Sequence, residues 1–206
     1  MKSVIARLTM VCMSLIILWL MLTSISDAEI KPILYWYLDG DAKDSSGEGN
    51  HGDIKGDPKT VEGKVRKALE FDGKEDYLFS PLLPLFMGKP FTVGVWVKPA
   101  SPVGGTVVNI TSQLDGAGLC HPLIGFDAGG TPGFFTYTGP KVVSNTVLPA
   151  NEWAYLAGVH DGKNSLIYVY ANKKLSVESV GVSVSDSGGP KYLYFAKSSA
   201  IPAVLC

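Results

Sequence analysis

The stretch Phe91–Pro99 reads FTVGVWVKP and decides the fold class. Every second residue from Phe91 to Val97 is apolar, which is the period of a β-strand with one buried side. The opposite side carries Thr92, Gly94, Trp96 and Lys98. Pro99 ends the pattern because proline has no N–H to donate. The stretch predicts a central strand with one face against a second sheet and the other face partly open.

The rest of the chain carries further short strand candidates separated by Gly, Pro, Asp and Asn. They cover Ile33–Leu38, Val65–Phe71, Tyr77–Ser80, Thr106–Thr111, Leu123–Asp127, Gly133–Thr138, Asn151–His160, Ser165–Ala171, Val180–Val184 and Lys191–Ala196. After the N-terminal segment, no long window shows a helical period. This pattern predicts an all-β, two-sheet antiparallel sandwich of jelly-roll type.

Charge and the N-terminus restrict the setting in which the protein acts. Lys and Arg number 18 against 19 Asp and Glu, so the chain lacks the basic surface that a nucleic-acid partner requires. Basic residues precede the apolar run Leu8–Leu22, and the small residues Ser26 and Ala28 follow it. We therefore predict a helical signal peptide over residues 1–28, one domain over residues 29–206, and a secreted, cell-surface or periplasmic location. The alternative is an uncleaved membrane anchor, although a spanning helix needs about 20 apolar residues.

Two cysteines, Cys120 and Cys206, remain in the predicted mature chain, and whether they pair is left open. The three histidines are scattered, and no Cys and His spacing matches a zinc site.

Five blocks of sequence carry a resemblance to a known family. In order they read YWYLDGDAKDSSGEGNHG, GKVRKALEFDGKEDYL, FTVGVWVKP, NEWAYLAGVHDG and IYVYANKKL. Together they resemble the laminin-G-like, concanavalin A-like jelly-roll domain over about residues 33–185. The resemblance implies two curved antiparallel sheets, no catalytic centre, and recognition of carbohydrate or of an extracellular protein. Some members of the family that the chain resembles hold a structural Ca²⁺ near the first long loop.

Two positions depart from the family pattern. A hairpin that usually carries glycine after asparagine has Lys173 after Asn172, and lysine tolerates a positive φ poorly. The family also closes with a glycine-rich turn and an acidic strand, whereas this chain ends with SSAIPAVLC. Either the final strand is missing and an edge is left open, or the tail forms a different strand. We expect a C-terminally truncated domain.

The first long loop, Asp39–Asp53, is rich in hard oxygen ligands of the kind that Ca²⁺ prefers. Its spacing does not match an EF-hand, and an ordinary loop whose Asp and Asn side chains cap their own turns is the alternative. The resemblance implies that Asp44 and Asn50 are the calcium ligands.

A carboxylate pattern raises the possibility of an enzyme. Glu70, Asp72 and Glu75 match the E-x-D-x-x-E signature of retaining glucanases, which place two carboxylates about 5 Å apart. Such a site needs one continuous strand, but Asp72-Gly73 is a turn dipeptide. We therefore interpret the segment as a hairpin corner with solvated charges, and keep a glycan-cleaving enzyme that uses Glu70 and Glu75 as the alternative function.

Aromatic side chains supply the binding candidates, because a flat ring stacks against the C–H face of a sugar. Trp36 and Trp153 share the apolar sides of their strands and are expected in the core. Trp96 lies on the more polar side of the central strand and, with Tyr137, is the predicted ligand contact. The sequence thus predicts a secreted, non-catalytic recognition module for carbohydrate or for an extracellular or glycosylated partner.

Overall fold

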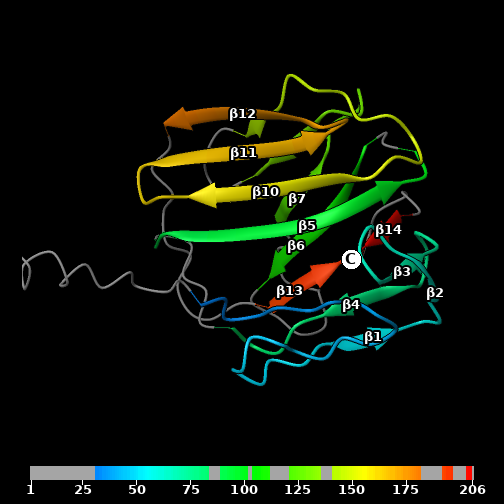
Figure 1. Ribbon diagram of the computed structural model, residues 1–206. Coiled ribbons are helices and arrows are strands. Elements are labelled where there is room, and N and C mark those ends of the chain that lie inside the picture. Colours follow the sequence, from blue (N-terminus) through cyan, green and yellow to red (C-terminus); the bar gives the residue numbers. More distant parts are fainter. Residues whose placement is uncertain are drawn as a thin grey trace, which may run out of the picture. The chain divides into compact units, whose positions relative to one another are not determined.

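The computed structural model (Figure 1) contains strands as its regular elements wherever the chain is described. It describes residues 31–83, 89–101, 104–111, 121–135, 141–181, 192–196 and 203–205. The predicted signal helix lies outside these residues. Within them, no helix is long and apolar enough to cross a membrane.

The strands of the unit Ile33–Cys206 form two antiparallel sheets of seven strands each. The first sheet has the order β1 (Asp53–Lys55), β4 (Tyr77–Phe79), β13 (Tyr192–Phe195), β6 (Gly105–Thr111), β7 (His121–Phe126), β8 (Pro132–Phe134) and β9 (Val142–Val143). The second has the order β12 (Lys174–Gly181), β11 (Asn164–Ala171), β10 (Ala154–His160), β5 (Phe91–Pro99), β14 (Ala203–Leu205), β3 (Lys67–Phe71) and β2 (Lys59–Glu62). The predicted all-β sandwich is confirmed.

Strand β5 occupies the centre of the second sheet, as its alternation predicts. It pairs with β10 over Phe91–Val97 and with β14 over Val97–Pro99. Val95 and Val97 are buried between the sheets, while Trp96 on the other side is half-buried. The burial of alternate residues in β5 therefore confirms one covered face and one partly open face.

The core fills the space between the two sheets. The ring of Phe91 in β5 packs edge-on against Phe134 in β8, with centroids 6.0 Å apart. Gly158 in β10 makes room for Phe134, because a Cβ atom at Gly158 would lie 2.1 Å from that ring. Trp36 is buried, donates from Nε1 to the carbonyl of Asn50 at 2.9 Å, and contacts Phe195 edge-on. The prediction of Trp36 as a core residue is confirmed.

The inner face of β10 differs from the prediction. The register pairs Leu156 with Val95 and Tyr155 with Trp96, so Leu156 shares the buried side of β5 and Tyr155 the open side. Tyr155 is accordingly exposed. Trp153 precedes β10 and is only half-buried, so its assignment to the core is wrong. Apolar residues occur on both sides of this strand, and only the pairing with β5 decides which side faces inward.

The C-terminal tail contributes strand β14, which lies between β5 and β3 in the second sheet. Ala203 pairs with Phe71 on one side and with Pro99 on the other. Of the two alternatives for the tail, the structure shows the second, in which it forms a different strand. The backbone pairing of β14 joins β2 and β3 to the rest of the second sheet.

The hairpin between β11 and β12 shows the strain expected at its turn. Ala171 pairs with Lys174, which leaves Asn172 and Lys173 as the two turn residues. Both have a positive φ, 51° at Asn172 and 63° at Lys173. Two positive φ values define the type I′ turn that fits the twist of the flanking strands. Lysine adopts this conformation at a cost that glycine would avoid.

Candidate functional site

Aromatic side chains from three neighbouring strands meet on the open face of the second sheet. Trp96 in β5 is the register partner of Tyr155 in β10, which is the partner of Tyr170 in β11. The ring centroids of Trp96 and Tyr155 lie 5.4 Å apart, and those of Trp96 and Tyr170 lie 6.2 Å apart at 87°. Tyr155 and Tyr170 are exposed by 36% and 39%, so their rings are available to a ligand.

A glycine determines where Tyr155 lies. The tyrosine ring extends over Gly94, so that a Cβ atom at Gly94 would be 2.2 Å from the hydroxyl oxygen of Tyr155. The absence of a side chain at Gly94 therefore allows Tyr155 to lie along β5 beside Trp96.

A second aromatic pair comes from the segment before Leu38. Trp36 points into the core, and alternation therefore directs its neighbours Tyr35 and Tyr37 outward. Their ring centroids lie 4.9 Å apart, and the side chains are exposed by 46% and 42%. Burial, followed by the neighbouring Tyr37 hydroxyl and then by Tyr155, raises the pKa of Tyr35 above its usual value.

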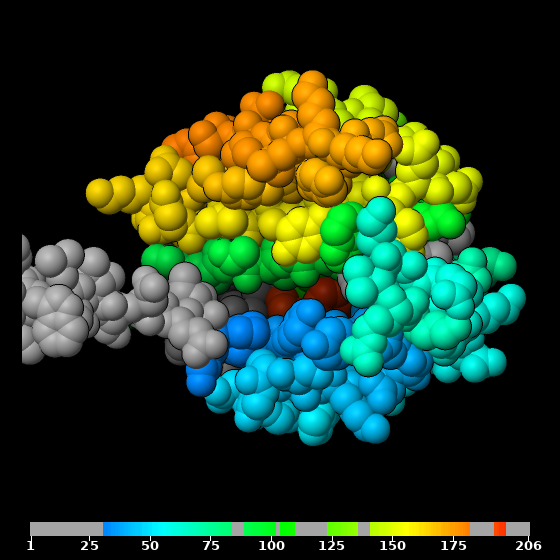
Figure 2. All heavy atoms as spheres, in the orientation of Figure 1, coloured from blue at the N-terminus to red at the C-terminus, as the bar shows by residue number. Residues whose placement is uncertain are grey.

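The turn between β2 and β3 places one cation against each group. Lys64 Nζ lies 5.6 Å from the ring centroid of Trp96, and Arg66 Cζ lies 4.7 Å from that of Tyr37. Both distances are typical of cation–π contacts. We call these seven residues the aromatic surface: Tyr35, Tyr37, Lys64, Arg66, Trp96, Tyr155 and Tyr170. In Figure 2 the blue N-terminal segment and the green and yellow strands face each other across a hollow, and the cyan turn lies at one end of it.

The position of Arg66 is fixed by Asp39. Arg66 has a positive φ of 62°, a conformation that costs a non-glycine residue about 1–2 kcal/mol. Asp39 accepts a hydrogen bond from the backbone N–H of Lys67 at 2.9 Å and pairs with Arg66 Nε at 3.0 Å. Gly63 closes the turn by donating to the carbonyl of Arg66 at 3.1 Å. Strain of this kind persists only where surrounding contacts hold it.

The aromatic surface contains one of the two predicted ligand contacts. Trp96 belongs to it, whereas Tyr137 lies outside the described residues. Trp96 is half-buried beneath its neighbours, so that most of the exposed ring area comes from tyrosines that sequence reasoning did not select. The signal for two of them was the YWY run around Trp36, in which a buried central residue implies two exposed neighbours.

Asp44 organises the loop that the resemblance associates with calcium. One carboxylate oxygen accepts hydrogen bonds from the N–H groups of Tyr35 and Ser46, at 2.9 and 3.0 Å. The other accepts from the Ser46 hydroxyl at 2.7 Å and the Asn50 N–H at 2.8 Å. Partial burial acts to raise the pKa of Asp44, but these hydrogen bonds outweigh it and lower the pKa well below its usual value. The loop thus holds the backbone of Tyr35 in place.

This donor set does not fit a cation at Asp44, because four protein donors already occupy its carboxylate. Among the described residues, no group of three or more His, Cys, Asp or Glu is arranged to hold a metal ion. Calcium at Asp44 and Asn50 stays a prediction, which thermal unfolding with and without Ca²⁺ would test.

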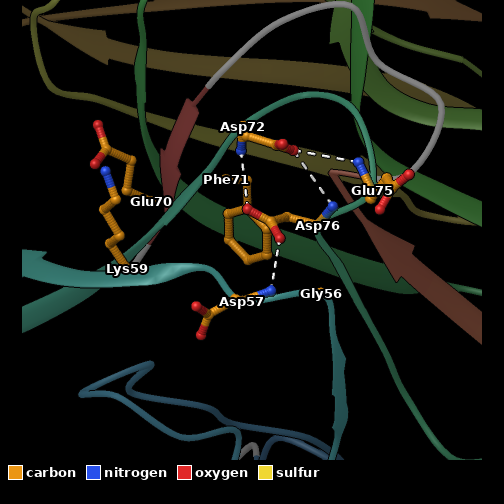
Figure 3. Close-up of a pocket in the computed structure, with 8 residues that line it drawn as sticks. All are labelled: Gly56, Asp57, Lys59, Glu70, Phe71, Asp72, Glu75 and Asp76. Carbon is orange, nitrogen blue, oxygen red and sulfur yellow. Dashed lines mark hydrogen bonds between the residues drawn. The ribbon is translucent and has the colours of Figure 1, made fainter.

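The carboxylates of the alternative enzyme hypothesis line a pocket of about 610 Å³ (Figure 3). Strand β3 ends at Phe71, and Asp72 begins a turn in which its Oδ1 accepts hydrogen bonds from the N–H groups of Lys74 and Glu75. Glu75 therefore follows the bend. Glu70 and Glu75 lie on opposite sides of the view in Figure 3. The predicted turn at Asp72-Gly73 is confirmed, and the three acids do not share one strand. The turn is not a hairpin, however, because β3 belongs to the second sheet and β4 to the first.

Comparison with known proteins places this fold in a family. A family model described as the concanavalin A-like lectin/glucanases superfamily matches residues 72–201, more than half of the chain. The chain belongs to this superfamily. The part that matches the concanavalin A-like model includes Trp96, Tyr155 and Tyr170, whereas the segment with Tyr35 and the β2–β3 turn precede it. A search of curated proteins finds no match.

Solved structures with similarity to this chain match it at low sequence identity. The binding domain of Paraclostridial Mosquitocidal Protein 1 is 15% identical with a TM-score of 0.56, over 79% of this chain and 44% of that one. This chain therefore spans less than half the length of that relative. Domain 4 of AbnA, an extracellular arabinanase of Geobacillus stearothermophilus, is 17% identical (TM-score 0.46; 83% and 89% covered). The exoplasmic/lumenal domain of VIP36 is 12% identical (TM-score 0.41; 75% and 82% covered).

Proposed function

We propose that this protein is a non-catalytic module that binds carbohydrate through the aromatic surface. The observation that carries the proposal is the group of exposed aromatic rings, in which Tyr155 and Tyr170 contact Trp96 and a second pair, Tyr35 and Tyr37, comes from the N-terminal segment. Each ring offers an apolar face to the C–H groups of a sugar and a hydroxyl that donates or accepts a hydrogen bond. Membership of a superfamily that contains lectins supports this function at a coarse level.

The aromatic surface is suited to binding without large rearrangement. Trp96, Tyr155 and Tyr170 lie on strands whose backbone is paired on both sides, and Asp44 holds the backbone of Tyr35. A preformed surface loses little conformational entropy when a ligand binds. Because the rings are exposed rather than enclosed, we expect a Kd of roughly micromolar to millimolar.

The geometry favours a soluble chain of several sugars. Neighbouring strands lie about 4.8 Å apart, a spacing comparable to one sugar unit in an extended polysaccharide. Trp96 and Tyr155 are tilted by 54°, and Trp96 and Tyr170 by 87°, so the rings do not form a flat platform. A twisted, hydrated chain can follow such rings, whereas the flat face of a crystalline polymer cannot.

The test is binding of a panel of soluble polysaccharides by affinity electrophoresis and calorimetry. We expect the native protein to bind at least one of them, and the double variant Y155A/Y170A to bind it at least tenfold more weakly. Y77A, which removes a ring from the first sheet, is the matched control and keeps native affinity. Circular dichroism confirms the fold of each variant. Failure of the native protein to bind any polysaccharide, or equal binding by native and double variant, would refute the proposal.

We also propose that the module acts outside the cytoplasm, because the N-terminal pattern predicts export. N-terminal sequencing of protein recovered from the exported fraction should begin at Glu29. A recovered chain that still begins at Met1 would contradict cleavage.

A further inference from the structure

The two cations of the aromatic surface come from one short turn and lie over two different rings. Lys64 lies against Trp96 on the open face of the second sheet, and Arg66 against Tyr37 in the N-terminal segment. The turn that carries them is fixed by the contacts of Asp39. Both charges are therefore held at defined positions beside the exposed rings.

These charges are available to a ligand. None of the ion pairs between described residues involves Lys64, which is exposed. Arg66 is paired with Asp39 through Nε, yet its side chain is 57% exposed. Asp39 offsets one of the two cations, so the turn contributes about one net positive charge to this end of the aromatic surface.

The Lys64 cation lies close to rings on which a sugar could stack. Lys64 Nζ lies 5.6 Å from the ring centroid of Trp96, and the ring centroid of Tyr155 lies 5.4 Å from that of Trp96. A sugar stacked on Tyr155 lies about 3.5–4.0 Å from that ring, the distance of carbon atoms in contact. An acidic substituent on such a sugar is therefore near the Lys64 ammonium. Arg66 Cζ holds a similar place at 4.7 Å from the ring centroid of Tyr37.

From this arrangement we propose that the protein selects acidic saccharides, whose uronate carboxylate pairs with Lys64 and Arg66 while the sugar rings stack on the tyrosines. This inference rests on the proposed carbohydrate binding. The planar guanidinium of Arg66 matches the two oxygens of a carboxylate, and the Lys64 ammonium adds a point charge. Neutral sugars engage the same rings but gain nothing from the two charges.

The experiment compares each acidic chain with its own methyl ester, which removes the charge and keeps the sugar. Polygalacturonate, polymannuronate and hyaluronan are titrated in both forms at low ionic strength. For the chain that binds, we expect the native protein to prefer the acid form about tenfold, because exposed charge pairs each add only modestly to affinity. The preference should fall at high salt because exposed charges are screened.

The variant K64Q/R66Q tests which residues cause the preference. We expect it to bind acid and ester within about twofold of each other. The single variant K64Q removes no ion pair of the turn, so it can still be tested if Arg66 proves necessary for folding. It should reduce the preference for the acid form about threefold. K55Q is the matched control, because Lys55 Nζ lies 5.7 Å from the ring of Phe79 on the first sheet. It should keep the native preference.

The outcomes separate this inference from the function on which it rests. Equal native binding of acid and ester would overturn the selectivity and leave carbohydrate binding intact. Absence of binding to every acid and every ester, together with the negative result from the neutral panel, would overturn both. If K64Q/R66Q and K64Q both keep the native preference for the acid form, the inference is also overturned, because residues other than Lys64 and Arg66 would then cause the preference.

Discussion

Replacement of Gly94 by alanine should weaken ligand binding without removing any aromatic ring. The new Cβ atom would lie 2.2 Å from the hydroxyl oxygen of Tyr155 and 2.9 Å from Cζ. Restoring an ordinary contact of roughly 3.5 Å to that oxygen requires a shift of about 1.3 Å at the end of the ring. Because Tyr155 is exposed, it can make this shift by rotating its side chain rather than by moving the sheet.

The two expected effects differ in size. Stability should change by less than about 1 kcal/mol, because alanine is at least as favourable as glycine in a strand. Affinity should fall roughly threefold to tenfold, since one well-placed aromatic contact contributes about 0.5–1.5 kcal/mol. Calorimetric titration with the polysaccharide that binds the native protein measures the affinity, and thermal unfolding measures the stability.

Gly158→Ala is the matched control for this prediction. Its Cβ atom would lie 2.1 Å from the ring of Phe134, an overlap of the same size, but in the core, where the ring cannot swing into solvent. We expect Gly158→Ala to cost about 1–3 kcal/mol of stability and to leave affinity unchanged at temperatures where it is folded. Native affinity in folded Gly94→Ala would show that Tyr155 does not contact the ligand. A stability loss equal to that of Gly158→Ala would show that Tyr155 is not free to move.

Three further predictions concern stability and catalysis. Lys173→Gly should stabilise the protein by about 1 kcal/mol, because glycine adopts the positive φ of 63° without strain, and a lower melting temperature would contradict this. The variant E70Q/E75Q and the native protein should both fail to release reducing ends from any polysaccharide that binds; hydrolysis that is lost in the variant would restore the enzyme hypothesis. Hydrogen bonds from Asn164 lower the pKa of Asp161 to about 2. The stability that the Asp161 carboxylate contributes is therefore present above its unfolded-state pKa of about 3.9 and is lost as the pH falls towards 2. Urea unfolding should therefore show a smaller acid-induced loss in Asp161→Asn, and equal losses in both proteins would disprove this role.

The sequence predicts the central strand well because burial alone determines its pattern. In β5, apolar side chains alternate with polar ones, and the buried side in the structure is the apolar side. The sequence of β10 shows no such alternation of apolar and polar residues. Gly158 is small but buried, because Phe134 occupies the space over it. His160 is polar but buried, and its ring nitrogen lies 3.3 Å from the hydroxyl oxygen of Ser165. The sequence alone therefore does not decide that Tyr155 lies on the open side.

The candidate site was predicted only in part, because its residues are distant in the sequence. Trp96 was identified from its own strand, yet Tyr35 and Tyr37 belong to a segment that reaches it only through the fold. The role of Arg66 depends on a left-handed backbone conformation and on Asp39, neither of which has a periodic signal. The prediction for Tyr137 remains untested by the described residues.

The position of β14 has a consequence for the order of folding. It pairs Leu205 with Leu69 and Val97, so the second sheet stays divided into two parts until residues 203–205 have been synthesised. One part carries the turn with Lys64 and Arg66, and the other carries Trp96. Pairings between such distant residues form slowly. The face that carries the aromatic surface is therefore completed only when residues 203–205 have joined the two parts of the sheet.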